Sequence, residues 1–264
     1  MSNEQSKLID DILSNELKDI LSQGKLGFEK EGLRVFQSKI SQAPHPYKIG
    51  SALCNKYITT DFSESQIELI TPPIADKIDG LLFLDDIHHF LSINNKDEIL
   101  WPLSMPPSIK SDEEIPIAKY GSSNIGLFKS LYRNGLSNRY GRLMQSISGI
   151  HYNYSLPDLV WETSFIKEYS SNPIKIRSQA YFRMLRNIYR MNWLILYLFG
   201  ASPIITKNFI SKDKESFKQL NKEESYLPYA TSLRMSDFGY HNSRRVNLNV
   251  CPNSIEEYVF DLRK

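Results

Sequence analysis

Cysteine is scarce in this sequence, with only two residues, Cys54 and Cys251, far apart in the chain. Neither belongs to a CxxC pair, so nothing in their spacing indicates a redox or zinc motif. A disulfide-based scaffold needs a denser set of cysteines than this. The cysteine content therefore favours a reduced, cytoplasmic protein.

An excess of charge of either sign is also absent. The 32 Lys and Arg residues nearly balance the 30 Asp and Glu residues and leave a net charge of +2, which gives no argument for a nucleic-acid or membrane-surface partner. The longest apolar run, Trp193–Phe199, is too short to span a bilayer. The polar N-terminus lacks the pattern of a signal peptide. We expect no nucleic-acid partner and no membrane partner.

Internal repeats and low-complexity linkers are missing as well. The 264 residues are 41% hydrophobic and 12% aromatic, which is sufficient for a sizeable core. We therefore predict one domain over residues 1–264.

Hydrophobic spacing predicts both helices and strands. Apolar residues recur with helical spacing over residues 8–21, 78–91, 127–132 and 176–199, and polar and apolar residues alternate over 27–35, 66–71 and 149–154. The arginines of the fourth helix are expected on its solvated face: Arg183, Arg186 and Arg190. The order of these segments predicts an α+β fold.

The segment Gly27–Val35 (GFEKEGLRV) carries an unusual alternation. As a strand, it puts Glu29 and Glu31 on the face that continues with Leu33 and Val35, while the nearby cations lie on the other face. A buried carboxylate is costly without a cationic partner, and a hard metal ion would provide one. The alternative is an edge strand whose charges face water.

Three further residues strengthen the metal interpretation. Asp61 ends the segment Tyr57–Asp61, Glu68 lies in an alternating segment that stops at Pro72, and His151 lies in another that precedes Pro157. Several carboxylates with one imidazole suit Mg²⁺ or Mn²⁺ better than Zn²⁺. By contrast, His88 and His89 fall within a helical pattern and are expected to be ordinary helix residues.

The last residues form an amphipathic helix that needs a cover. Ser254 and Glu257 have capping-box spacing, and an apolar stripe follows at Ile255, Tyr258, Val259 and Leu262. Either this helix packs back on the domain, or the chain is the front part of something longer.

Several long segments resemble the proteobacterial glutamate–cysteine ligase family. They are GFEKEGLRV from Gly27, KYITTDFSESQIELITPP from Lys56, WPLSMPP from Trp101, KYGSSNIGLFKSLYRNGLSNRYGRLMQSISGIHYNYSLP from Lys119, YLFGASP from Tyr197 and YLPYATSLRMSDFGYHN from Tyr226. The resemblance implies a glutamine-synthetase-like fold with a curved antiparallel sheet flanked by helices. It also implies the chemistry: ATP phosphorylates the γ-carboxylate of glutamate, and the cysteine amine attacks the acyl phosphate to give γ-glutamylcysteine.

The resemblance also implies roles for individual residues. The metal ligands of the family match Glu29, Glu31, Asp61, Glu68 and His151. The wall around the cysteine side chain matches Phe62, Tyr132, Leu136 and Tyr240, with Gln145 as a polar neighbour. Arg234 matches an arginine that binds a substrate carboxylate, a role that suits its planar fork.

Family members are about twice as long as this sequence, and the fold is therefore expected to be incomplete at the C-terminus. Two interpretations follow: an active ligase, or a truncated, non-catalytic fragment that needs a C-terminal continuation or a complementary chain as its partner. A third interpretation, metal-dependent amide hydrolysis by the same carboxylates, lacks an evident base beyond His151.

Overall fold

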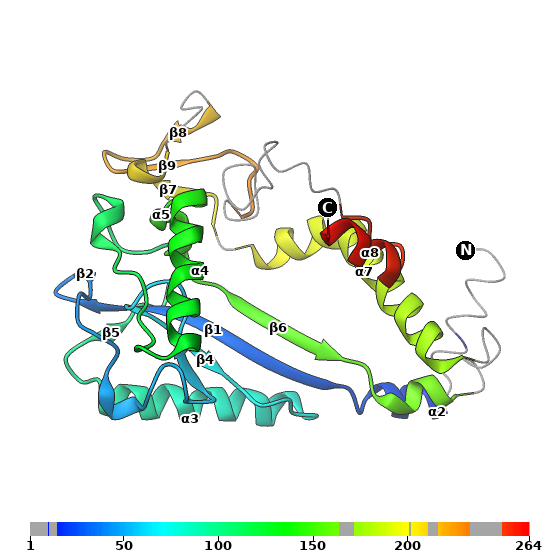
Figure 1. Cartoon of the computed structure of the whole chain (residues 1–264). Helices are drawn as coiled ribbons and strands as arrows, with labels where there is room; N and C mark the ends of the chain where they lie inside the picture. Colours follow the sequence, from blue (N-terminus) through cyan, green and yellow to red (C-terminus); the bar gives the residue numbers. More distant parts are fainter. Residues whose placement is uncertain are drawn as a thin grey trace. The chain divides into compact units, whose positions relative to one another are not determined.

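A computed structural model of the chain describes residue 10 and residues 15–163, 172–200, 202–210, 216–232 and 250–263. Figure 1 shows the elements along the chain. The described helices are α2 (Asn15–Leu21), α3 (Lys77–Asn94), α4 (Asn124–Tyr140), α5 (Arg142–Gln145), α7 (Pro173–Phe199) and α8 (Ile255–Leu262). The described strands are β1 (Lys25–Phe36), β2 (Lys39–Ile40), β3 (Ile58–Thr60), β4 (Gln66–Ile70), β5 (Ile99–Leu100), β6 (Ile150–Ser155), β7 (Ile204–Thr206), β8 (Lys218–Gln219) and β9 (Glu224–Tyr226).

Contacts divide the chain into two compact units. The first comprises residues 1–26, 154–198 and 242–264, and the second comprises residues 27–153 and 199–241. One domain over residues 1–264, which the sequence predicts, stays a prediction.

The second unit is built on the long strand β1. Strand β1 pairs antiparallel with β4, which pairs with β3, and β1 also pairs with β6, β2 and β5. A separate three-stranded antiparallel sheet has the order β7-β9-β8. Antiparallel pairing leaves one face of a sheet free to be polar while the other packs on the core.

One face of the main sheet packs on helix α3. Ile58, Ile67 and Leu69 form a buried cluster with Ile87 and Leu91 of the helix. Each such side chain stabilises the fold by about 1.5–3 kcal/mol when it is fully buried. Asp76, which the sequence reasoning did not single out, caps the helix by accepting hydrogen bonds from the backbone N–H groups of its first turn.

Two cations of β1 lie on this side of the strand and have partners there. The ammonium nitrogen of Lys30 lies 3.0 Å from Nε2 of His88, whose Nδ1 lies 2.7 Å from the Leu84 carbonyl oxygen. Arg34, only 1% exposed, forms an ion pair with Glu98 at 2.7 Å. His88 therefore does more than an ordinary helix residue, because it connects the sheet to α3.

Gly32 of β1 has no room for a side chain. A Cβ atom built there would lie 2.9 Å from Cδ1 of Leu100 in β5. The glycine therefore permits the close approach of β5 to β1.

The first unit centres on helix α7. Val160, Trp161 and Ile176 form its buried cluster, and Trp161 contacts the ring of Tyr181. Helix α8 contacts α7 through the Phe182 and Tyr258 rings, whose centroids are 5.8 Å apart. Figure 1 shows these two helices side by side.

The structure of this unit tests two predictions from the sequence, one about α8 and one about α7. Ser254 caps α8 by accepting a hydrogen bond from the Glu257 N–H, as its spacing predicts. Arg186 was expected on a solvated face, but it is half-buried and donates to the carbonyl oxygens of Pro252 and Asn253 just before α8. That expectation is wrong for Arg186, because the helical pattern could not show that a distant loop would need a donor.

The predicted α+β class, with an antiparallel sheet flanked by helices, is confirmed. Of the first predicted helix, 8–21, the structure describes residue 10 and the helix Asn15–Leu21. Both cysteines are free. In the part of the chain that the structure describes, none of the helices combines the length and the apolar composition that a membrane span requires.

Candidate metal centre

The pairing of β1 with β4 places acidic side chains on the face opposite α3. Glu31 is the direct partner of Glu68, and Glu29 is the partner of Ile70. Directly paired residues project to the same face, and so do residues two apart on one strand. Glu29, Glu31 and Glu68 therefore share one face, the carboxylate face, as the alternation in the sequence predicts.

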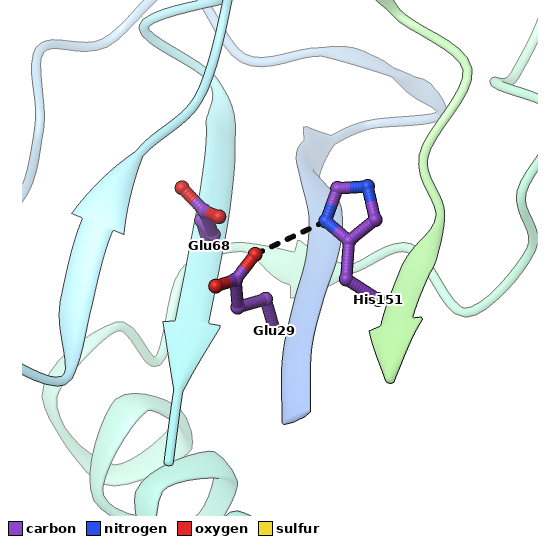
Figure 2. Close-up of side chains that lie close together, drawn as sticks. All are labelled: Glu29, Glu68 and His151. Atoms are coloured by element: carbon purple, nitrogen blue, oxygen red, sulfur yellow. Dashed lines mark hydrogen bonds and ion pairs between the residues drawn. The ribbon is translucent and has the colours of Figure 1, made fainter. Parts of the chain in front are cut away.

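Strand β6 adds an imidazole from the other side of β1. Nδ1 of His151 lies 3.2 Å from Oε2 of Glu29. Figure 2 shows Glu68, Glu29 and His151 on three neighbouring strands, with their polar ends directed toward one another. One ligand atom from each of the three lies within 4.8 Å of the others, which is close enough for a single metal ion to bind all three.

A second residue of β6 orients Glu29. Nδ2 of Asn153 donates a hydrogen bond to Oε1 of Glu29 at 3.0 Å. Asn153 was not among the sequence-based candidates, although it lies two residues after His151 in the same alternating strand. That spacing is the signal that could have identified it.

Glu31 is held by protein donors. Its side chain is 5% exposed, and Oε2 accepts hydrogen bonds from the Gly149 N–H at 2.9 Å and from Nε2 of Gln66 at 3.3 Å. Sequence reasoning missed Gln66 and Gly149 as partners, because they come from two different segments of the chain. These donors fix the Glu31 carboxylate beside Glu68.

The carboxylate face carries more negative charge than its protein partners compensate. Burial, together with the negative charges of Asp61, Glu31 and Glu29, raises the pKa of Glu68 to about 7. The positive charge of Arg133 opposes the rise in the Glu68 pKa. Clustered carboxylates that raise the pKa of one of their members are a feature of functional sites.

Asp61 lies near this group at the end of β3. Its backbone carbonyl accepts hydrogen bonds from Nε of Arg133 and from the Tyr120 hydroxyl, the latter at 3.0 Å. The Asp61 charge acts on Glu68, but Asp61 is not among the three residues whose ligand atoms lie within 4.8 Å of one another. Of the five candidate ligands, the structure therefore brings Glu29, Glu68 and His151 closest together.

The structure describes four of the candidates for substrate contact, and their surroundings differ: Phe62, Tyr132, Leu136 and Gln145. Phe62 is buried in a hydrophobic cluster with Leu33 and Val35, and Leu136 packs against that cluster. Tyr132, one turn before Leu136 on α4, is 58% exposed. Gln145 is buried at the end of α5. The other two candidates, Arg234 and Tyr240, lie outside the described residues.

Comparison with known proteins identifies the family. The sequence model described as glutamate-cysteine ligase matches residues 9–264. The chain belongs to the glutamate–cysteine ligase family. This membership accounts for the long segments in which the sequence resembles that family.

Curated glutamate–cysteine ligases and solved structures agree with this family. The chain is 44% identical to the enzyme of Pseudomonas entomophila, covering 98% of this chain and 51% of that protein. It is 49% identical to the enzyme of Sodalis glossinidius, covering 90% and 46%. The crystal structure of the Francisella tularensis glutamate–cysteine ligase in complex with AMP superposes with a TM-score of 0.83, at 38% identity, over 91% of this chain and 47% of that one.

A second solved structure also matches most of this chain. It is a bifunctional glutathione synthetase from Pasteurella multocida, with a TM-score of 0.78 and 33% identity over 96% of this chain and 32% of that one. The chain spans about half the length of the curated glutamate–cysteine ligases that it matches.

Proposed function

We propose that this chain contributes the metal-binding part of an ATP-dependent ligase that joins glutamate to cysteine to form γ-glutamylcysteine, the first step of glutathione synthesis. The observation that carries the proposal is the convergence of Glu29, Glu68 and His151 on one sheet face in a member of the glutamate–cysteine ligase family. The Francisella tularensis relative binds AMP, which supports ATP as the nucleotide substrate.

The residues of the carboxylate face fit a hard divalent cation. Glu29, Glu68 and His151 would hold Mg²⁺, or Mn²⁺ in its place, and Asp61 and Glu31 remain proposed ligands. The donor set is rich in oxygen, and the high pKa of Glu68 reflects burial together with uncompensated negative charge. The ion would neutralise charge on the phosphates of ATP during phosphoryl transfer.

The chain's own residues would position this site for chemistry. Asn153 holds the Glu29 carboxylate, and Gln66 and Gly149 hold the Glu31 carboxylate, so the acidic groups are oriented before a ligand binds. Such preorganisation lowers the cost of reaching the transition state. The sheet beneath them is fixed by its apolar packing on α3.

Substrate contacts are proposed for six residues. We propose that Phe62, Tyr132, Leu136 and Tyr240 surround the cysteine side chain, with Gln145 beside it, and that Arg234 binds a substrate carboxylate. An apolar wall discriminates between substrates by only about 1–3 kcal/mol per missing contact, so the charged Arg234 would contribute strongly to specificity. We also propose a reducing, cytoplasmic location, which the two free cysteines support.

The proposal has two forms that one experiment separates. The purified 264-residue chain is assayed for γ-glutamylcysteine formation and ADP release with ATP, Mg²⁺, glutamate and cysteine. The same assay is repeated with the remaining half of the Pseudomonas entomophila ligase added as a second polypeptide. This arm is motivated by the half-length match to that relative.

Product formation by the chain alone would identify it as an active ligase. Product that forms only with the added half would identify a half-subunit. Metal-dependent amide hydrolysis predicts glutamate release from γ-glutamyl amides instead. No product in either arm, from samples that bind Mg²⁺ normally, would contradict the proposed ligase function.

A further inference from the structure

Helix α4 holds two cations over one tyrosine ring beside the carboxylate face. The ammonium nitrogen of Lys129 lies 5.0 Å from the ring centroid of Tyr120, and the guanidinium carbon of Arg133 lies 4.6 Å from it. Both side chains are half-buried. A single aromatic ring thus attracts two positive charges from successive turns of one helix.

The ring itself is firmly placed. Tyr120 is 5% exposed, and its hydroxyl donates toward the carbonyl oxygens of Thr60, at 2.5 Å, and Asp61, at 3.0 Å. Burial raises the pKa of Tyr120 to about 12, so the hydroxyl stays a donor at neutral pH. The Tyr120 ring, the platform that the two cations contact, is therefore fixed to the end of β3, where Asp61 begins the connection to β4.

Arg133 is also held at a defined position. Its Nε donates to the carbonyl oxygen of Asp61, and its Nη1 donates to that of Lys129 at 3.1 Å. Within the described part of the chain, no hydrogen bond involves its Nη2. The guanidinium is thus anchored on one side and retains donor capacity on the other.

The charges around this platform are unevenly matched. Like charges four residues apart on a helix repel each other, so Lys129 and Arg133 are not an arrangement that helix stability favours. The negative charges of Asp61 and Glu68 raise the pKa of Tyr120, and the positive charge of Arg133 lowers the pKa of Glu68. A divalent cation bound by the carboxylates would neutralise their negative charge. Lys129 and Arg133 would then be available to bind another anion.

We propose that Lys129 and Arg133 form a phosphoryl-binding site on the Tyr120 platform, adjacent to the carboxylate face. The chemical class of ligand is a phosphoryl group, which a guanidinium fork and an ammonium bind through charge-assisted hydrogen bonds. It has two sources, the terminal phosphate of ATP or an acyl phosphate. This inference rests on the proposed function only in assigning the anion as phosphoryl.

The test measures binding to the 264-residue chain by isothermal titration calorimetry with Mg²⁺ present. The probes are β,γ-imido ATP, AMP and acetyl phosphate. The variants are Arg133→Gln, Arg133→Lys and Lys129→Gln. The matched control is Arg139→Gln, because Arg139 lies on the same helix with its guanidinium 5.8 Å from the ring centroid of Tyr140.

Arg133→Gln is expected to weaken β,γ-imido ATP binding about tenfold or more, Arg133→Lys to weaken it less, and Lys129→Gln to weaken it by a few-fold. AMP, which has no terminal phosphate, should bind all variants equally, and Arg139→Gln should match the wild type. Acetyl phosphate binding that depends on Arg133 would extend the site to acyl phosphates. Its failure to bind would restrict the site to the nucleotide phosphate.

Equal β,γ-imido ATP binding by the wild type and Arg133→Gln would overturn the inference. So would a loss of AMP binding in Arg133→Gln as large as its loss of β,γ-imido ATP binding. Absence of binding of every probe by the wild type would also overturn it. Thermal unfolding of each variant separates misfolding from loss of binding, and Arg133→Lys keeps the test valid if the glutamine variant unfolds. Arg133-dependent binding without ligase activity would contradict only the proposed function. Ligase activity without such binding would contradict only this site.

Discussion

Strand β1 carries charged side chains of two kinds, and their surroundings differ. Arg34 is nearly fully buried, but Glu98 neutralises its charge and the carbonyl oxygens of Ala43 and Glu64 accept its Nη2 hydrogens at 2.6 and 2.9 Å. On the carboxylate face, Glu29 has His151 and Asn153, which are weaker partners for a full negative charge. A buried charge with a matched partner supports the fold, whereas clustered charges of one sign indicate a ligand site.

The largest effect is expected from breaking the compensated pair. Arg34→Met would leave the Glu98 carboxylate buried without its cation, at a cost of about 3–5 kcal/mol in the free energy of unfolding. Urea denaturation of the 264-residue chain measures this loss. Burial alone would raise the Glu98 pKa, but Ser41 and Arg34 hold it below its ordinary value.

A double variant sharpens that prediction. Arg34→Met with Glu98→Leu removes both charges, and it should recover most of the stability lost in the single variant. A single variant as stable as the wild type would contradict the role assigned to Arg34.

The next effect concerns catalysis, in whichever assay the chain is active, alone or with the added half. Glu29→Gln keeps the side-chain shape but removes one negative charge from the proposed metal site, so the turnover rate should fall on the order of a hundredfold or more. The metal-free melting temperature should stay equal or rise, because one negative charge is removed from the acidic cluster. The exposed Glu223 provides the control through Glu223→Gln, and normal turnover of Glu29→Gln at saturating Mg²⁺ would count against Glu29 as a ligand.

Metal binding should stabilise the fold directly. A cation that binds only the folded chain adds about 2.7 kcal/mol to the free energy of unfolding at a concentration a hundred times its Kd. Urea denaturation with increasing MgCl₂ or MnCl₂, at constant ionic strength, measures this gain. Glu68→Gln should remove most of it, and an equal gain in wild type and variant would show that the ion binds elsewhere.

A smaller effect is expected from pH in the absence of metal. The folded-state pKa of Glu68 is about 7, above the ordinary value of 4.5, so the folded chain binds this proton more tightly than the unfolded chain. The Glu68 contribution to stability is therefore present below pH 4.5 and lost as pH rises to 7, by about 1–2 kcal/mol after allowance for partial solvent screening. Urea midpoints at pH 5 and 7.5 should differ less in Glu68→Gln, and an unchanged difference would contradict this assignment.

The smallest effect is expected from the exposed ion pair. The His151 and Glu29 side chains are 54% and 34% exposed, so His151→Ala should change the free energy of unfolding by no more than about 1 kcal/mol. The same variant should weaken Mn²⁺ binding, measured by electron paramagnetic resonance. A large loss of stability would make His151 a structural residue.

The sequence predicted the parts of the molecule that depend on local pattern. The alternation in GFEKEGLRV predicted β1 and the shared face of Glu29 and Glu31, because strand periodicity fixes side-chain direction wherever the strand forms. The helical spacing after Asn124 predicted α4, and its bounds are Asn124–Tyr140. The metal-ligand candidates came from the alternation of acidic residues and were matched by the family resemblance, whereas the substrate residues came from the resemblance alone, and all of these roles stay predictions.

What the sequence could not predict depends on contacts between distant segments. The Arg34 pair with Glu98 joins residues 64 positions apart, and the hydrogen bond from Arg186 to Pro252 joins residues 66 apart. No local pattern encodes such partners. Likewise, the position of Arg133 over Tyr120 depends on how α4 packs beside β3, which hydrophobic spacing alone does not determine.

The pairing of β1 with β4 has a consequence for folding. A shift of β1 by a single residue would turn Lys30 and Gly32 toward the acidic cluster and press Glu29 and Glu31 against Ile87 and Leu91 of α3. Carboxylates buried among aliphatic side chains would make that misaligned strand pair much less stable. The apolar face of the sheet thus helps to fix the strand register that brings the acidic side chains together. Substitutions that weaken the packing of α3 are therefore expected to disturb the positions of the proposed metal ligands as well as to lower stability.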